Sequence, residues 1–431
     1  MSHAFLLFVI VFALLFLMRM PVPLSMICSC IVYCMYTGMN VQMIAQKSLA
    51  SLYGNYALFA VPLFIFAANI MNEGKVTDYV FGFAKGFVGH LPGGLAHVNV
   101  LASLIFSGMT GSAIADAAGL GKMEIAAMKN EGYDDGFSCA ITAASATIGP
   151  IFPPSIPMVI YSMLSSASVG ALFLGGMVPG ILLAAFLMIY VAFVSHKRNY
   201  PRDERVKLNA FLKYTAKALP AIFTPVILLF GIYAGVVTAT EAGAIAGLYA
   251  LLISVLYYRS MGGKAFLQLI KTTIKDTGTT ALMVGAAAPM SYIVARERIA
   301  DSLSAFILGF TDNRYVLLLL VNILFLVLGC LIDTNVLQLV FIPLILPVVQ
   351  AFNIDLVHFG ILLTFNMMIG LSTPPFGMLL FITSGISGTP LKKVVKEIWW
   401  PIAVMLLVLA IVTYFPDVSL FLPRIFMGYK G

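Results

Sequence analysis

The chain has 431 residues, of which 61% are apolar and 10% are charged, and its formal net charge is +7. Apolar segments close to the roughly 20 residues that span a bilayer recur along it, which excludes a soluble protein and indicates a polytopic membrane protein in contact with lipid. Lys and Arg of membrane proteins concentrate in cytoplasmic loops, so the positive charge indicates no nucleic-acid partner. We expect no enzyme and no organic cofactor, because the sequence lacks a phosphate-binding loop and a His-Glu-x-x-His motif.

The first part of the chain, 1–195, is predicted to form one structural repeat. The first apolar segment has no basic residues before it and no Ala-x-Ala site after it, so we interpret it as a retained helix. In chain order we expect scaffold helices within 4–71 (near 4–18, 22–39 and 56–71), a polar arm at 72–90, a hairpin at 92–128, a broken helix at 137–165 and a helix at 171–195.

A basic segment at 196–217 follows, and we interpret it as a cytoplasmic linker between two repeats. The second repeat is expected at 218–416. It is predicted to contain scaffold helices within 218–294 (218–237, 239–258 and 277–294), an arm at 295–314, a hairpin at 316–350, a broken helix at 358–387 and a helix at 399–416, before a periplasmic tail at 417–431.

The two repeats share the motif Gly-x-x-x-Pro-Pro, which begins at position 149 and again 221 positions later, at 370. Proline lacks an N–H and clashes with the preceding turn, so each motif breaks its helix, at Pro153-Pro154 and at Pro374-Pro375. Broken helices survive in a membrane only where protein or a water-filled cavity covers them. Matched breaks in matched halves are typical of secondary transporters, whereas a channel would need a continuous pore.

Each repeat is predicted to cross the membrane five times, because its hairpin enters and leaves on one face. An odd number of crossings inverts the second repeat relative to the first. With the linker in the cytoplasm, both termini are periplasmic, and the Lys and Arg residues agree with this orientation. Of the 25, all fall on the cytoplasmic side except Lys47, Arg296, Arg298, Arg314, Arg424 and Lys430.

The first hairpin tip, from Ser107 to Ser112, combines glycines with hydroxyl side chains. Hydroxyl and carbonyl oxygens are hard ligands that suit Na⁺, and exposed backbone amides suit a carboxylate. Small residues also permit close packing of helices, which is the structural alternative. The spacing from Gly108 to Gly149 recurs from Gly329 to Gly370, and this repetition favours the ion and substrate interpretation.

The second hairpin tip carries Asp333 inside an apolar segment, where a charge is costly and indicates a functional residue. The alternative is an aspartate that caps the following helix, and both roles are compatible. Arg296 could hold a substrate carboxylate through two hydrogen bonds, or it could pair with Glu297 at the membrane interface. The residues that we assign to the substrate are Arg296, Asp333, Thr110, Ser112 and Ser155.

With these motifs the chain resembles the large, DctM-type membrane subunit of the tripartite ATP-independent periplasmic (TRAP) transporters. The resemblance covers nearly the whole chain, although Ala239 replaces a proline that is usual in the family and Met109-Thr110 replaces a common serine. It implies an elevator-type Na⁺ symporter for an organic acid of the sialic acid, C4-dicarboxylate or keto-acid class. The Na⁺ sites that it implies are formed by Ser107, Gly108 and Gly149 in one half and Gly329, Gly370 and Thr373 in the other.

The resemblance also implies partners and a location. A periplasmic binding protein would deliver the substrate, and a small Q-type membrane subunit of about four helices would cover part of the apolar surface. The location would be a bacterial inner membrane. An intramembrane enzyme has no support in the sequence. The remaining alternative is a stand-alone Na⁺- or H⁺-coupled carboxylate transporter of similar architecture that requires neither partner.

Overall fold

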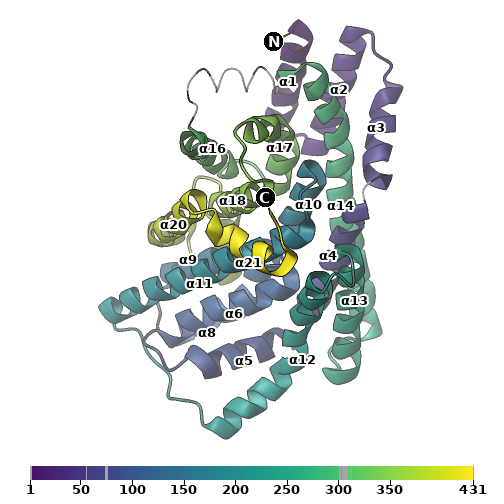
Figure 1. Ribbon diagram of the computed structural model, residues 1–431. Helices are drawn as coiled ribbons and strands as arrows, with labels where there is room; N and C mark the ends of the chain where they lie inside the picture. Colours follow the sequence, from purple (N-terminus) through teal and green to yellow (C-terminus); the bar gives the residue numbers. More distant parts are fainter. Residues whose placement is uncertain are drawn as a thin grey trace.

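The computed structural model describes residues 2–54, 56–72, 76–299, 302, 309, 311 and 313–430, and this part of the chain is helical with no β-strand. Six helices are long and apolar enough to cross a membrane, and eight shorter apolar helices of 10–17 residues accompany them. The chain therefore has the all-α polytopic fold that its composition predicts (Figure 1).

The first half consists of short helices followed by one long helix. Side-chain hydroxyls cap several of their first turns: Ser2 accepts from the Phe5 N–H, and Ser168 accepts from the Ala171 N–H. The elements are α1 (His3–Leu17), α2 (Val22–Thr37), α3 (Gln42–Tyr53), the 3₁₀ helix η1 (Tyr56–Phe59), α4 (Ala60–Asn72), α5 (Val76–Val88), α6 (Gly94–Thr110), α7 (Ala113–Ala118), α8 (Leu120–Asn130), α9 (Asp135–Ala146), α10 (Ile156–Ser165) and α11 (Val169–Arg198).

The second half contains longer helices. Thr238 and Glu241 form a capping box in which each side chain accepts a backbone N–H of the other residue, and this fixes the start of α13. The elements are α12 (Leu208–Tyr233), α13 (Ala239–Leu252), the π-helix η2 (Ile253–Tyr257), α14 (Gly263–Arg296), α16 (Arg314–Gly329), α17 (Thr334–Ala351), α18 (Leu356–Leu371), α19 (Met378–Ser387), α20 (Leu391–Tyr414) and α21 (Asp417–Met427).

The linker predicted at 196–217 is wrong in its bounds, because α11 continues to Arg198 and α12 begins at Leu208. Lys and Arg are good helix formers, and their aliphatic stems pack along apolar surface while the charge stays at the edge. The Lys217 Nζ lies over the aromatic ring of Tyr79, 5.6 Å from the ring centre. A run of basic residues therefore marked two helix ends as well as the loop between them.

Three further expectations differ from the structure. Residues 42–53 form α3, a helix that was not predicted, and α14 has 34 residues where 277–294 was expected. The tail predicted at 417–431 contains the helix α21. These segments are polar or amphipathic, so a search for spans of uniform apolarity passes over them. Most of the arm predicted at 295–314 lies outside the described residues.

The two halves correspond helix by helix from the hairpins onward. The starts of α6, α9, α10 and α11 lie within one residue of positions 221 before the starts of α16, α18, α19 and α20. Both Pro-Pro bonds, Pro153-Pro154 and Pro374-Pro375, are cis and lie between the two parts of a broken helix. The breaks predicted from the proline motifs are thus present in both halves.

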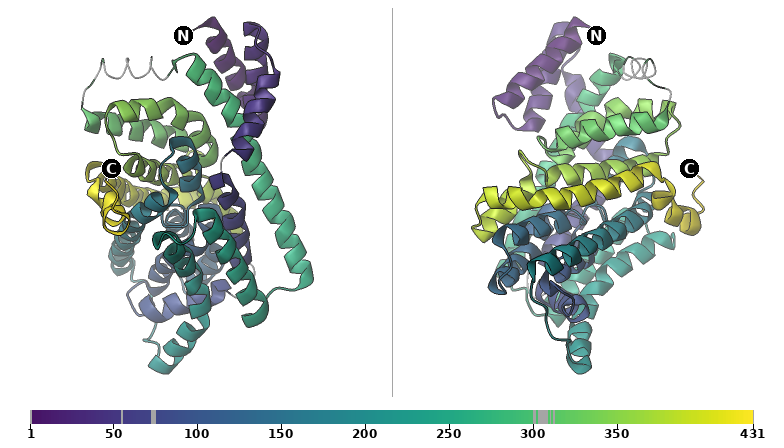
Figure 2. Two further views of the ribbon diagram at one scale, coloured as in Figure 1. Left: turned by 45° about the vertical axis from the view of Figure 1, so that its right-hand side comes forward. Right: turned by 90° about the vertical axis from the view of Figure 1, so that its left-hand side faces the viewer.

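The buried apolar side chains form three clusters. The largest joins the helices of both hairpins and both broken helices with α4, α11, α12, α13, α20 and α21. A second joins α1 and α2 to α14 and to single faces of α10 and α17, and a third joins α5 and α6 to α12 and η2. Figure 2 shows the consequence for the shape: α1, α2 and α3 stand beside α14, apart from the layered helices of the largest cluster.

A polar clamp connects three helices at one end of the molecule. The Arg198 guanidinium, at the end of α11, donates to Asp134 at 2.8 Å and to Glu397 of α20 at 2.8 Å. The Tyr200 hydroxyl donates to the same Asp134 carboxylate at 2.7 Å. The Tyr200 hydrogen bond and the Arg198 charge hold the pKa of Asp134 below its ordinary value.

We predict that Arg198→Gln lowers the unfolding temperature of the purified protein at neutral pH. The groups are partly exposed, so each lost pair is worth only about 0.2–1 kcal/mol. Because the folded pKa of Asp134 is depressed, this stabilisation is present above the ordinary aspartate pKa of about 3.9 and disappears as the pH falls through the folded value.

Thermal unfolding of the wild type and the variant, measured between neutral and acidic pH, tests this prediction. Arg424→Gln is the matched control, because its partner Asp417 lies in the same helix, α21. An equal loss in both variants, or a difference that persists in acid, would show that the clamp does not connect the helices energetically.

Candidate functional site between the hairpin tips

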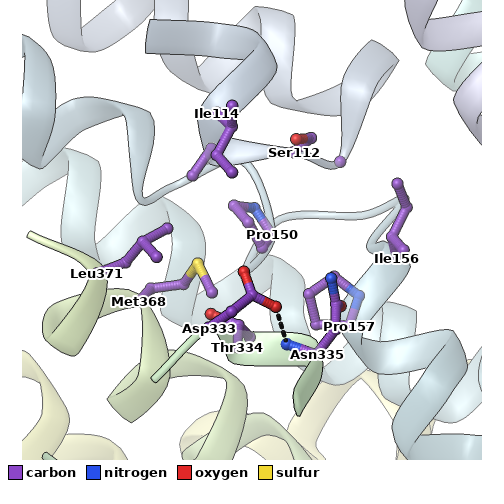
Figure 3. A pocket seen from close by; sticks show the side chains of 12 residues that line it. Ser112, Ile114, Pro150, Ile156, Pro157, Asp333, Thr334, Asn335, Met368 and Leu371 are labelled. Carbon is purple, nitrogen blue, oxygen red and sulfur yellow. Dashed lines mark hydrogen bonds between the residues drawn. The ribbon is translucent and has the colours of Figure 1, made fainter. Parts of the chain in front are cut away.

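A small cavity of about 90 Å³ lies where both hairpin tips meet both broken helices. In Figure 3, Asp333 and Asn335 lie on one side of it, Ser112 and Ile114 lie on the opposite side, and Pro150 lies between them. The complete lining is Gly111, Ser112, Ala113, Ile114, Pro150, Ile156, Pro157, Asp333, Thr334, Asn335, Met368 and Leu371. Four segments that are remote in sequence therefore converge on one point.

The first hairpin tip is shaped by the turn between α6 and α7. Gly111 has φ +61°, and its N–H donates to the Ser107 carbonyl at 3.2 Å, which ends α6. The Ser112 hydroxyl then accepts from the Ala115 N–H at 3.3 Å and begins α7. A Cβ at Gly111 would lie 2.3 Å from the Pro154 carbonyl oxygen, so the tip contacts the first helix break directly.

The first break is closed by its own polar groups. The Ser155 hydroxyl donates to the Pro150 carbonyl and accepts from the Met158 N–H at 3.2 Å, so it satisfies both ends of the interrupted helix. A Cβ at Gly149 would lie 3.3 Å from the Ser112 carbonyl carbon. The backbone of the break and the backbone of the hairpin tip are thus in close contact, with little room for a side chain.

The second hairpin tip repeats this arrangement with different residues. The Asp333 carboxylate accepts from the Asn335 N–H at 2.9 Å and caps α17. A Cβ at Gly370 would lie 2.7–2.9 Å from backbone atoms of Gly329, so the second hairpin and the second broken helix touch through their backbones. The structure therefore confirms that Asp333 caps α17.

A larger cavity of about 610 Å³ adjoins the small one. It shares Ser112, Ile114, Ile156, Asp333 and Asn335 with the small cavity, and its other wall is formed by α4 and α14. That wall is polar, because its lining includes Asn69, Asn72, Asp276, Thr279 and Thr280. The hairpin tips thus face a cavity with a polar wall that α4 and α14 form.

Three of the five residues assigned to the substrate line these cavities: Ser112 and Asp333 line both, and Thr110 lines the larger one. Ser155 lies immediately before the lining residue Ile156 but uses its hydroxyl to close the break. Arg296 lines neither cavity.

Arg296 instead belongs to a polar group at the end of α14. Its charge acts on Tyr33 of α2 and on its neighbour Glu297. The Glu297 carboxylate accepts hydrogen bonds from the Tyr33 and Ser2 hydroxyls, each at 2.5 Å. Hydrogen bonds from Ser2 and Tyr33 hold the pKa of Glu297 below its ordinary value. Both roles predicted for Arg296, with a substrate carboxylate and with Glu297, stay predictions.

None of the residues assigned to Na⁺ belongs to the lining of the small cavity. Gly149, Gly329 and Gly370 form the backbone contacts described above. The hydroxyls of Ser107 and Thr373 donate to carbonyls of their own helices, at 2.5 Å and 2.6 Å. A Cβ at Gly108 would lie 2.9 Å from Pro225 of α12, so this glycine also serves close packing.

Several lining residues were not predicted. Asp276, Thr279 and Thr280 of α14 occupy a helix that was read as ordinary scaffold, although a carboxylate within a long helix is the signal that singled out Asp333. Met368 and Pro157 gave no signal, because an apolar residue in a transmembrane segment looks the same whether it faces lipid, core or cavity.

Comparisons with known proteins agree with this architecture. Residues 9–418 match the model of the tripartite ATP-independent periplasmic transporter, DctM component. The chain is 40% identical to the sialic acid TRAP transporter large permease protein SiaM of Vibrio cholerae, over 95% of this chain and 96% of that one. It is 35% identical to the C4-dicarboxylate TRAP transporter large permease protein DctM of Pseudomonas aeruginosa, over 86% and 87%.

Two further similarities extend the comparison. The sialic acid TRAP transporter permease protein SiaT of Haemophilus influenzae is 35% identical over 96% of this chain and 68% of its own length. The crystal structure of the YdaH transporter of Alcanivorax borkumensis matches with a TM-score of 0.64 at 12% identity, covering 88% of this chain and 89% of that one. At this low identity the structural match supports the fold alone.

We predict that Gly370→Ala destabilises the protein by about 1–3 kcal/mol, because the added methyl group forces apart the backbones of α16 and α18. Gly385→Ala in α19 is the matched control, since a Cβ there meets no atom within 4 Å. Thermal unfolding of both variants in detergent tests the prediction. Equal midpoints for the two variants would show that the Gly329–Gly370 contact does not require the absence of a side chain.

Proposed function

Because this chain belongs to the DctM component family of the tripartite ATP-independent periplasmic transporters, we propose that it is the large permease subunit of a Na⁺-coupled organic-acid uptake system. Members of this family are transporters, and this chain is accordingly a multi-pass membrane protein without enzymatic activity. The observation that carries the proposal is the cavity shared by two hairpin tips and two broken helices, which is where an inverted-repeat transporter binds its substrate.

The proposed transport domain consists of the two hairpins and the two broken helices, which all contribute to the largest apolar cluster, together with α4, α12 and α13 of the proposed scaffold. The scaffold consists of the three helices before each hairpin together with the arms. In this proposal the two halves are inverted repeats, both termini are periplasmic, and the transport domain moves as an elevator across a bacterial inner membrane. The helix correspondence at 221 positions supports the repeats, and the charge distribution supports the orientation.

Na⁺ is proposed to bind at the tips, with oxygens from Ser107, Gly108 and Gly149 in one half and from Gly329, Gly370 and Thr373 in the other. Helix breaks and turns leave carbonyl oxygens that hard cations prefer. The bound ion orders the tips, and ordered tips then accept the substrate carboxylate, so the ion favours the binding-competent state.

The substrate is proposed to be a hydroxylated organic acid of the sialic acid class, with C4-dicarboxylates and keto acids as the next candidates. The relative of highest identity named here is a sialic acid permease. The hydroxyl and amide groups that line the 610 Å³ cavity, from Asn69, Asn72, Thr279 and Thr280, suit a polyhydroxylated molecule. Ser112, Thr110 and Ser155 are proposed to orient it, while the assignment of Arg296 to its carboxylate stays a prediction.

Two partners follow from the tripartite family: a small membrane subunit and a periplasmic binding protein. We propose that the small subunit packs on the scaffold. Large apolar side chains are exposed there on α12 and α13, and such a surface can be covered by a partner subunit. These include Val226, Phe230, Leu248 and Leu252.

We predict that uptake of labelled sialic acid into proteoliposomes requires this chain, the small subunit, the binding protein and an inward Na⁺ gradient. The control replaces Na⁺ with K⁺ at the same ionic strength, and labelled C4-dicarboxylates and keto acids are tested in parallel. Uptake by this chain alone would support the stand-alone transporter instead. Uptake that does not depend on Na⁺ would overturn the assignment of the tips to Na⁺.

We predict that Asp333→Asn reduces uptake at least about ten-fold while leaving the protein folded. Asparagine caps a helix as well as aspartate does, so the variant removes the charge and keeps the cap. Asp355→Asn is the matched control, because Asp355 caps α18 through the Val357 and His358 amides and lines neither cavity. Normal uptake by the Asp333 variant would show that the Asp333 charge is not needed for transport and that the residue only caps α17.

A further inference from the structure

Two carboxyl groups are buried outside both cavities, in the first hairpin. Asp116 of α7 and Glu124 of α8 are each only 1% exposed. Neither belongs to any ion pair found among the described residues. Both oxygens of Asp116 and the Oε1 of Glu124 lack a hydrogen-bond partner in the same part of the chain. The site therefore contains several unpartnered acceptors.

A chain of hydrogen bonds connects Glu124 to Ser103, which lies beside Asp116. Ser103 of α6 lies next to Asp116, and its hydroxyl is 3.2 Å from the hydroxyl of Ser145 in α9. The Ser145 hydroxyl is 2.7 Å from the Asn99 Oδ1, to which it donates, and the Asn99 Nδ2 donates to the Glu124 Oε2 at 2.6 Å. This hydrogen-bonded path, from Ser103 beside Asp116 through Ser145 and Asn99 to Glu124, is called the carboxyl relay below.

The N–H and O–H donors of the carboxyl relay already donate to other acceptors. Asn99 Nδ2 also donates to the Thr142 hydroxyl at 2.7 Å, and Thr142 donates to the Ser138 carbonyl at 2.8 Å. An amide nitrogen carries two protons and a hydroxyl carries one, so these groups supply no further donor to the open carboxyl oxygens. A proton on one of the carboxyl groups would provide the missing donor.

The electrostatic repulsion between the two carboxyl groups also indicates that one of them is protonated. Two ionised carboxylates in a buried site repel each other, and each loses its hydration without gaining a cation. The helices packed against α7 and α8 provide no such cation: Lys129 is bound to Asp135 at 3.3 Å, Lys122 is exposed, and α19 carries no charged residue. The other titratable groups on these neighbours are His97 of α6, which is itself buried, and Cys139 of α9, whose thiol contacts Ser387.

We propose that Asp116 and Glu124 form a proton-binding site, in which one of the two carboxyl groups holds a proton at neutral pH within the first hairpin. An Na⁺ ion fits less well here, because the Asn99 N–H group points at Glu124 and neither cavity reaches the carboxyl groups. The relay connects α6, which carries the first hairpin tip, to α9, which leads into the first break. Loss of the proton would place two negative charges between these helices, so the protonation state controls how firmly they hold the tip.

Infrared difference spectroscopy of the full-length protein in lipid nanodiscs, recorded along a pH series without Na⁺ or substrate, tests the proposal. The wild type is expected to show the carbonyl band of a protonated carboxylic acid at neutral pH, and to lose it at alkaline pH. Glu124→Gln and Asp116→Asn are each expected to lose this band. Glu131→Gln is the matched control, because Glu131 is solvent-accessible and pairs with Lys85 at 3.6 Å.

Thermal unfolding provides a second measurement on the same samples. The wild-type midpoint is expected to fall between neutral and alkaline pH, and Glu124→Gln, which carries its own N–H donors and no charge, is expected to lose most of this dependence. Absence of the band in the neutral wild type would overturn the proposal. So would its removal by Na⁺ at constant pH, which would indicate a cation site. If the Glu124 variant does not fold, the Asp116 variant gives the same comparison, and neither result depends on transport.

Discussion

The constraint on which this structure depends is the covering of two interrupted helices inside an apolar environment. Where a helix breaks, carbonyl and amide groups lose their partners, and in lipid each such group costs several kcal/mol. The chain covers each break with the tip of a hairpin from the same half. Gly111 lies against Pro154 in one half, and Gly329 lies against Gly370 in the other. Serine and aspartate caps satisfy the remaining groups, so the tips are both structural covers and the walls of the cavity.

Each half also joins its hairpin to its broken helix through buried side-chain hydrogen bonds, although the residues have diverged. In the first half Ser145 donates to Asn99 at 2.7 Å. In the second half Asn366, which is 221 positions after Ser145, donates to Asn322 at 2.9 Å, and Asn322 donates to Thr413 at 2.9 Å. Hydrogen bonds in a water-free core fix relative position in a way that apolar contacts do not. The same position in each repeat thus serves to orient the hairpin on its partner helix.

The sequence predicted the features that depend only on the chemistry of individual residues and not on their neighbours in space. Pro153-Pro154 and Pro374-Pro375 located the breaks, because proline disrupts a helix in any surroundings, and Asp333 was found because a carboxylate in an apolar segment is rare. The sequence could not show which apolar residues face the cavity, nor that α14 reaches 34 residues, because both depend on neighbouring helices. Glu124 was missed for a related reason: it lies beside Lys122 in a helix that reads as amphipathic, and only the packing of α6 and α9 buries it.

The contacts also differ in kind between the parts of the molecule, and this difference bears on the proposed elevator movement. Within the hairpins and broken helices the contacts are close and directional: glycine backbones in contact and buried asparagine hydrogen bonds. Between these helices and α14 they are apolar, made by Ile160, Val336 and Leu339 against Val284 and Ala287. A cavity of about 230 Å³ lies in that same interface, so its packing is incomplete. Non-directional, incompletely packed contacts at α14 would permit the sliding that the proposed elevator movement requires, whereas the glycine and asparagine contacts would keep the hairpins and broken helices together during it.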